Sequence, residues 1–334
     1  MYGQAKMNNQ ASEMVKRLCT AIQTLAACSR TVVRLEYRVN EDMVLTLPIT
    51  IVKGNPSDTI LWVQGGMHGD EYDGPEAACR FLEQLQENCF SGTVVVFPMV
   101  NPTAFEAQQN ASPLDGVNLN RVFGTVKQVS ASYAYGEFLL ELIRHTTSFV
   151  IDLHGGGQYL NVCRFAMIAK TGTDADSVSS QAAHCCGAEY IYVNSSEQCG
   201  MMINGLSRLG IPGILLENGG GLSWQEQAVQ HHLDAVFRIM AFLGMTDAVQ
   251  TTTQQTTEIA QVTELYFECG GLLRRSVSVG EMVVKGQLLL ETQDIRTGEH
   301  HRIVCPVEQG VVLSIHTAAL VTKNQYAVMI GRLE

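Results

Sequence analysis

Positive charge is scarce in this sequence, and charged residues of either sign are uncommon. Lysine and arginine number 22 against 33 aspartate and glutamate residues, which gives a formal net charge of −11 at pH 7. This balance argues against a general nucleic-acid binder or a protein of anionic membrane surfaces, because both need a positive surface. The residues are 46% hydrophobic and only 16% charged, so the chain can bury a sizeable core.

Long apolar runs and a recognisable leader segment are also missing. The longest apolar run, near residues 93–100, is too short to cross a bilayer, and residues 1–6 lack the basic and apolar regions of a signal peptide. The ten cysteines include no C-x-x-C pair, which fits free thiols in a reducing compartment better than a disulfide framework. We therefore expect a cytoplasmic protein with no membrane and no nucleic-acid partner.

The patterning predicts an α/β fold: a mostly parallel or mixed sheet flanked by helices, followed by an all-β region. We expect an N-terminal helical extension (1–30), a catalytic domain (31–250) and a small β domain (251–334), with a polar linker at 251–257. A long irregular loop is expected over 101–129. Helices are expected at 13–28, 76–88, 132–145, 174–186, 201–209 and 224–243, and strands at 31–37, 43–52, 59–63, 92–100, 148–153, 161–169, 189–193 and 211–217.

Polar side chains stand where several of these strands end. His68 and Glu71 follow the strand at 59–63 as H-x-x-E, and His154 ends the strand at 148–153. Ligands of parallel sheets bind at the carboxyl ends of the strands, so these three residues can meet. Two histidines and one glutamate suit one Zn²⁺ ion and leave a coordination position open for hydrolysis. Each alone is weak evidence, because a polar loop or a buried structural histidine is common.

Further residues fit around such a site. Asp152 lies two residues before His154 on the same strand face and can orient an imidazole. Glu217 ends the strand at 211–217 and could transfer protons, although a lone carboxylate there could equally cap a helix. Arg121 with Asn120 could bind a substrate carboxylate, and the alternative is a structural arginine bonded to loop carbonyls.

Several short motifs occur together in one order along the chain. They are His68-x-x-Glu71, Asn101-Pro102-x-Ala104-Phe105, Asp115-Gly116-x-Asn118-Leu119-Asn120-Arg121-x-Phe123, Asp152-Leu153-His154 and Glu217. Taken together they resemble the succinylglutamate desuccinylase/aspartoacylase family, within the zinc carboxypeptidase-like hydrolases. The match covers roughly residues 59–221.

The resemblance implies a function and a set of roles. It implies zinc bound by His68, Glu71 and His154, with Glu217 as general base and acid. It also implies that Asn120 and Arg121 hold the carboxylate of a small N-acyl amino acid, whose amide bond is hydrolysed by an activated water.

Two features depart from the family pattern. Asn110 stands where relatives usually carry an arginine before the Ser-Pro-x-Asp-Gly stretch, so an uncharged donor would replace a charged one at the oxyanion. Arg121-Val122-Phe123-Gly124 lacks the usual proline. The run at 279–289 looks like a biotinyl/lipoyl-type barrel-sandwich domain, but 300–302 offers no carrier lysine, so this domain is expected to be a lid or an assembly surface.

Three alternatives stay open at this point. The same chemistry would serve a zinc exopeptidase acting on short peptides, and Asn110 makes a catalytically weak binding or scaffold protein plausible. A thiol hydrolase using Cys163 or Cys199 has no local signature in its favour. The sequence leaves open the acyl group, the amino acid, a contact between Arg164 and substrate, and the formation of a homo-oligomer.

Overall fold

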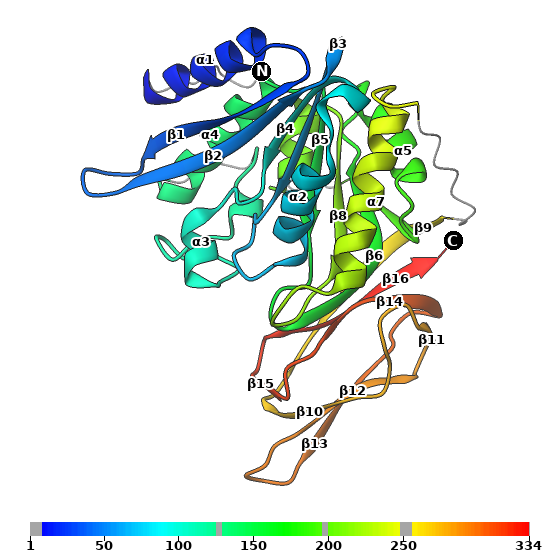
Figure 1. Cartoon of the computed structure of the whole chain (residues 1–334). Coiled ribbons are helices and arrows are strands. Elements are labelled where there is room, and N and C mark those ends of the chain that lie inside the picture. Colours follow the sequence, from blue (N-terminus) through cyan, green and yellow to red (C-terminus); the bar gives the residue numbers. More distant parts are fainter. Residues whose placement is uncertain (1–8, 125–128, 196–199, 248–255, 334) are drawn as a thin grey trace.

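The computed structural model describes residues 9–124, 129–195, 200–247 and 256–333 (Figure 1). A twelve-stranded mixed sheet runs through it in the order β1-β2-β4-β3-β5-β8-β6-β7-β9-β16-β14-β11, and a four-stranded sheet has the order β13-β12-β10-β15. The expected α/β class is confirmed. The strands are β1 (Ser29–Arg38), β2 (Val44–Lys53), β3 (Asn55–Gly65), β4 (Ser91–Phe97), β5 (Phe149–His154), β6 (Leu160–Ala169), β7 (Tyr190–Asn194), β8 (Gly213–Gly219), β9 (Thr257–Tyr266), β10 (Gly271–Arg275), β11 (Met282–Val284), β12 (Leu288–Gln293), β13 (His300–Val304), β14 (Gln309–His316), β15 (Leu320–Val321) and β16 (Tyr326–Leu333).

Helices cover both faces of the large sheet, as Figure 1 shows. On one face α2, α5 and α7 bury a core with strand residues such as Leu61 and Ile151. On the other face α1, α4 and α6 pack around the fully buried Trp62. Two-sided burial explains why the central strands are continuous apolar runs. The helices are α1 (Asn9–Thr24), α2 (Asp73–Gln84), α3 (Pro102–Ala107), α4 (Ala131–Arg144), α5 (Ala175–Cys185), α6 (Met202–Arg208) and α7 (Glu226–Phe242), with short 3₁₀ turns η1 (Glu87–Cys89) and η2 (Leu119–Arg121).

The expectation of one irregular loop over 101–129 was wrong in part. Residues 102–107 form α3, and residues 119–121 form the 3₁₀ turn η2. The side chain of Asn101 accepts a hydrogen bond from the Ala104 N–H, and Pro102 occupies the first turn. An asparagine cap followed by proline is a helix start signal, and the sequence carried it. Residues 125–128 and most of the expected linker at 251–257 lie outside the described residues.

The parallel centre of the sheet positions the polar residues. β4, β3, β5 and β8 run parallel as neighbours, with Gln64 paired with Asp152 and His154 paired with Glu217. Paired residues of adjacent strands put their side chains on the same face. The register therefore brings residues that are far apart in sequence to one end of the sheet.

The C-terminal strands join this same sheet. β9 pairs with β7, β16 with β9, and β14 with both β16 and β6, so β6, β7, β9, β16 and β14 close into a ring of five strands. Ser314 of β14 pairs with Val162 of β6. The C-terminal segment thereby reaches the strand that lies next to Glu217. Figure 1 shows the four-stranded sheet projecting below this ring.

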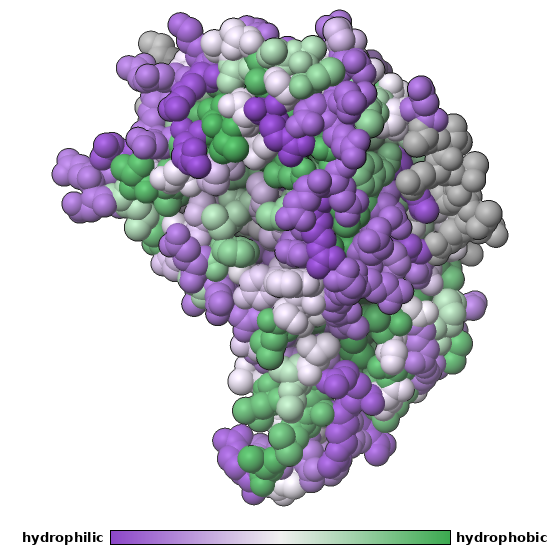
Figure 2. Space-filling model, viewed as in Figure 1, coloured by the Kyte–Doolittle hydropathy of each residue, from purple (hydrophilic) through white to green (hydrophobic). Residues whose placement is uncertain are grey.

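Hydrophilic and hydrophobic residues are mixed over the face seen in Figure 2, and hydrophobic residues are also present at the lower end, where Figure 1 places the small sheet. Leu272, Ile295 and Leu320 are exposed hydrophobic residues of this region. Among the described residues, no helix has both the length and the apolar character needed to cross a membrane.

Candidate active site

The loop after β3 presents His68 and Glu71 toward each other. The Nδ1 atom of His68 lies 2.7 Å from Oε1 of Glu71, and both side chains are buried. The loop is tightly packed at Gly69, where an added Cβ would lie 1.8 Å from the carbonyl oxygen of Ala104. A side chain at this position would displace the loop, so glycine is required there.

His154 reaches Glu71 from the neighbouring strand β5. Its Nδ1 atom lies 3.0 Å from Oε2 of Glu71, and its Nε2 atom lies 3.1 Å from Oδ2 of Asp152. Asp152 is held in turn by Gln64, whose Nε2 donates to Oδ1 over 2.9 Å. The sequence left open which imidazole Asp152 would orient, and the structure places it beside His154.

The three candidate ligands form one compact group. One ligand atom each from His68, Glu71 and His154 lies within 4.8 Å of the others, and all three residues are buried. Both imidazoles turn Nδ1 toward Glu71. Their Nε2 atoms face polar partners, Asn118 Oδ1 at 3.1 Å for His68 and Asp152 for His154. Metal-binding histidines usually have a polar group of this kind beside the second nitrogen.

The buried charges also fit a cation. Burial opposes ionisation, but the His68 and His154 imidazoles hold the pKa of Glu71 well below its usual range. Burial lowers the pKa of His154, yet the Asp152 and Glu71 carboxylates outweigh it and raise that pKa well above its usual value. Both nitrogens of His154 are buried without an aligned hydrogen-bond partner among the described residues. A site that favours positive charge and holds an unsatisfied ligand nitrogen fits a bound divalent metal.

Glu217 lies beside this group on β8. It is paired in register with His154, so the two side chains share a face of the sheet. Burial raises the pKa of Glu217, as do the Glu71 and Asp152 carboxylates, while His154 and Arg121 act in the opposite direction. A carboxyl group with a raised pKa can hold a proton near neutral pH, as a general acid must.

The residues predicted to bind substrate differ in their surroundings. Asn120 is buried, and its Oδ1 accepts a hydrogen bond from the Met202 N–H at the start of α6. Arg121 is exposed and donates from Nη1 to the Asn120 carbonyl oxygen. Asn110 is exposed, and its Oδ1 accepts a hydrogen bond from the side-chain amide of Asn118. Asn118, in turn, contacts His68, so Asn118 lies between Asn110 and His68.

Sequence reasoning missed several residues that support the site. Asn118 contacts His68, and its place in the Asp-Gly-x-Asn motif was the available signal. Asp73 accepts hydrogen bonds from the backbone N–H groups of Gly220 and Gln225, which ties the loop after β3 to the loop after β8. His232 on α7 donates from Nε2 to the carbonyl oxygen of His154 over 2.9 Å. No local sequence pattern indicated these last two contacts.

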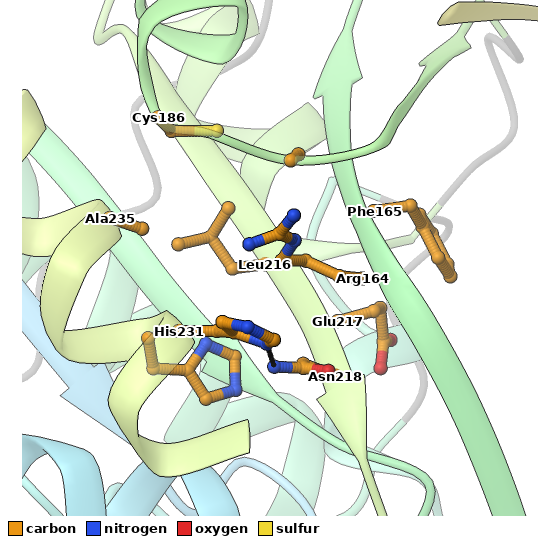
Figure 3. Close-up of a pocket in the computed structure, with 10 residues that line it drawn as sticks. Arg164, Phe165, Cys186, Leu216, Glu217, Asn218, His231 and Ala235 are labelled. Carbon is orange, nitrogen blue, oxygen red and sulfur yellow. Dashed lines mark hydrogen bonds between the residues drawn. The ribbon is translucent and has the colours of Figure 1, made fainter. Parts of the chain in front are cut away.

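Arg164 lies on the opposite side of β6 from the candidate site. Its neighbour Phe165 is paired with Glu217, and successive strand residues point to opposite faces. Figure 3 shows Arg164 beside Leu216, in a cavity that is also lined by His231 of α7. Its guanidinium pairs with Glu189 over 3.3 Å. The Arg164 side chain therefore lies between the sheet and α7, away from the candidate site.

The thiol alternative gains no support from Cys163. The side chain is buried, and burial raises the pKa of its thiol far above the usual value, which disfavours the nucleophilic thiolate. Cys199 lies outside the described residues.

Known proteins similar to this chain are enzymes of one hydrolase family. Residues 58–243 match the model of the succinylglutamate desuccinylase/aspartoacylase catalytic domain. The N-alpha-acetyl-L-2,4-diaminobutyric acid deacetylase of Halomonas elongata is 29% identical over 273 residues, which cover 78% of this chain and 77% of the relative.

Solved structures share the fold over nearly the whole chain. The product-bound ectoine utilization protein EutE of Ruegeria pomeroyi superposes with a TM-score of 0.81 at 20% identity, covering 92% of this chain and 97% of that one. A succinylglutamate desuccinylase/aspartoacylase of Rhodobacter sphaeroides gives a TM-score of 0.80 at 19% identity, covering 93% and 98%.

The matched segment makes up more than half of the chain and contains His68, Glu71, His154 and Glu217. The chain belongs to the succinylglutamate desuccinylase/aspartoacylase family. Its named relatives are deacylating enzymes, which confirms the prediction that this chain is an enzyme of an amide-hydrolysing family.

Proposed function

We propose that this protein is a zinc-dependent deacylase that hydrolyses the amide bond of a small N-acyl amino acid. The observation that carries the proposal is the buried group of His68, Glu71 and His154, with Glu217 in register beside it. The family and the deacetylase relative support the same reaction class. A zinc exopeptidase would need the same ligands, but the names of the relatives favour acyl removal over peptide cleavage.

In the proposed mechanism His68, Glu71 and His154 would hold the zinc ion, and Asn118 and Asp152 would orient the two imidazoles. When bound, zinc would polarise the amide carbonyl and make water a stronger nucleophile. A carbonyl oxygen that gains charge needs nearby donors, and Asn110 is proposed as an uncharged one.

Glu217 acts as general base and then as general acid. As a carboxylate it accepts a proton from the attacking water, and as a carboxylic acid it returns that proton to the departing amine nitrogen. Burial raises its pKa, so the protonated form remains accessible near neutral pH. The products are the free amino acid and the carboxylic acid of the acyl group.

Arg121 binds the substrate carboxylate. Its guanidinium is exposed, carries a fixed charge and acts electrostatically on Glu217, so it lies close enough to orient a substrate there. Asn120 holds α6 through Met202 and carries the carbonyl that Arg121 bonds, so it helps to place Arg121. Direct contact between Asn120 and substrate stays a prediction.

Two variants test the proposal. His68→Ala should lose zinc retention, measured by elemental analysis of the purified protein. Glu217→Gln should keep zinc and lose turnover by about 100-fold or more, as expected when a proton-transfer group is removed. Assays should compare a panel of N-acetyl amino acids with dipeptides. A Glu217→Gln enzyme of near-normal rate would contradict the assigned role, and a metal-free wild-type protein that stays inactive with added zinc would favour a scaffold.

The proposal also covers the domains of the chain and its cellular compartment. We propose a catalytic domain at 31–250 and a barrel-sandwich-like β domain at 251–334 that shapes the site and offers a lid or assembly surface. The separate apolar core around Phe267 and Leu290 supports the second unit. A reducing cytoplasm is proposed because the nine cysteines among the described residues form no disulfide.

A further inference from the structure

The C-terminal strands share a face of the sheet with the candidate active site. On β8, Leu215 and Glu217 are two residues apart, so their side chains lie on one face. Leu215 packs in one apolar cluster with Val162 of β6 and Leu313 of β14, and Met329 of β16 packs against that cluster. Met329 therefore lies on the same side of the sheet as Glu217.

The same face continues to β9. Met329 is paired with Glu264 of β9. Tyr266 follows Glu264 by two residues on that strand. The hydroxyl of Tyr266 donates to Oε2 of Glu264 over 2.7 Å, and its ring meets the ring of Tyr326 edge-on at 5.7 Å.

These contacts form a small wall of one carboxylate and two phenols. Ser314 and Tyr326 share a hydrogen bond of 2.6 Å, which fixes the second ring. Tyr266 is 49% exposed, and Glu264 is exposed as well. Within the described part of the chain, Glu264 forms no ion pair, and Tyr266 is its hydrogen-bond partner. The wall therefore offers a negative charge to whatever occupies the site.

Charged groups of both signs shift the pKa values of the two tyrosines in this wall. The hydrogen bond to Glu264 raises the pKa of Tyr266 to about 12, and burial adds to this, while Arg121 lowers it. Burial raises the pKa of Tyr326, and both Glu264 and Glu217 add to that rise. Arg121 and Glu264 thus both shift the pKa of Tyr266. Glu264 and Glu217 both shift the pKa of Tyr326. Such a pair of charges suits a ligand with a carboxylate and, further along, a cation.

We propose that Glu264 binds a positively charged group on the side chain of the substrate amino acid, so that the enzyme prefers N-acylated basic amino acids. This specificity rests on the proposed deacylase function. Tyr266 holds the Glu264 carboxylate in place, and the two rings form an apolar edge beside the substrate's methylene groups. Arg121 binds the α-carboxylate of the same molecule, so substrate is held at both charges.

The experiment compares substrates of similar size and different charge. The probes are Nα-acetyl-ornithine, Nα-acetyl-norvaline and Nα-acetyl-glutamate, assayed with zinc-loaded wild type and with Glu264→Gln, which keeps the shape and removes the charge. We expect wild type to have the highest kcat/KM for the ornithine derivative. Glu264→Gln should lower that value by about 10- to 100-fold, the range for loss of one charged hydrogen-bond partner. The norvaline derivative should be hydrolysed at an unchanged rate.

A matched control is Glu258→Gln, an exposed glutamate at the other end of the same strand, which faces His184. It should leave all three substrates unaffected. Tyr266→Phe should lower kcat/KM for the ornithine derivative less than Glu264→Gln does, because the carboxylate remains but loses its positioning bond.

A second readout separates this inference from the proposed reaction. Free ornithine and norvaline are measured by calorimetry as ligands of the zinc-loaded protein. Tighter binding of ornithine that disappears in Glu264→Gln supports the subsite even if no acylated substrate is cleaved, an outcome that would overturn only the deacylase proposal. Hydrolysis of the panel with no charge preference, and with Glu264→Gln equal to wild type, refutes the subsite alone.

Discussion

Replacing His232 with glutamine should reduce the loss of unfolding free energy that the protein shows at acid pH. His232 is buried on α7 and donates from Nε2–H to the carbonyl oxygen of His154. Burial lowers the pKa of this imidazole from 6.5 to about 4, more than its hydrogen bond to His154 raises it. Protonation of the folded protein at His232 is therefore unfavourable.

The sign of the effect follows from proton binding. Between pH 6.5 and pH 4 the unfolded chain binds a proton at His232 that the folded chain does not, so stability falls as the pH falls through this window. The full difference between the two pKa values corresponds to about 3 kcal/mol, and about 2 kcal/mol of it is lost between pH 8 and pH 5. Above pH 7 the contribution is complete.

The assay is urea unfolding of the metal-free protein at pH 8 and pH 5, for wild type and for His232→Gln. The variant keeps an N–H donor for the His154 carbonyl but cannot titrate. All other titratable groups are the same in both proteins, so the difference between the two pH-dependent losses isolates His232. We expect wild type to lose about 2 kcal/mol more than the variant. Equal losses in the two proteins would refute the assignment of a neutral buried imidazole at this position.

Two further predictions concern the site itself. Asp152→Asn should weaken zinc binding by about 10- to 100-fold, since it removes the charge beside His154, and competition with a chelator measures this; an unchanged affinity would count against the orienting role. Arg121→Ala should raise KM for N-acetyl amino acids with a much smaller change in kcat, because it removes a charge that holds substrate, and an unaltered KM would argue against the carboxylate contact.

The parallel centre of the fold and the candidate ligands could be predicted from sequence. Apolar strands covered on both faces are continuous hydrophobic runs, and the polar residues after them stand at predictable strand ends. His68, Glu71 and His154 were found this way, because convergence at one sheet edge follows from strand direction. The two-residue spacing of Asp152 and His154 likewise predicted a shared face.

Other contacts depend on register between distant segments, which local patterns do not encode. Asp73 begins α2, and its bonds to Gly220 and Gln225 require the start of this helix to approach the loop after β8. His231 and His232 are adjacent on α7. The selection of His232 to meet the His154 carbonyl depends on how α7 packs against the sheet.

Arg164 shows how a single register decides a role. As a sequence feature it was a plausible second cation for substrate, since it follows the strand of the third ligand. The irregular pairing of β6 with β8 sets Phe165 opposite Glu217, which turns Arg164 toward α7 and Glu189. The residue of β6 that shares a face with Glu217 is the neighbour of Arg164, Phe165.

In the proposed subsite the second charge, beside that of Arg121, comes instead from Glu264 of the C-terminal segment, and it is negative. β14 pairs with the start of β6, and this pairing closes the ring that carries Glu264 and Tyr266 to the site. If the proposed subsite exists, the C-terminal strands contribute side chains to the substrate pocket in addition to packing beside it. Because Glu264 and Arg121 have opposite signs, such a pocket would discriminate by the charge of the amino acid, whereas the proposed metal ligands would act on the amide bond that all N-acyl amino acids share.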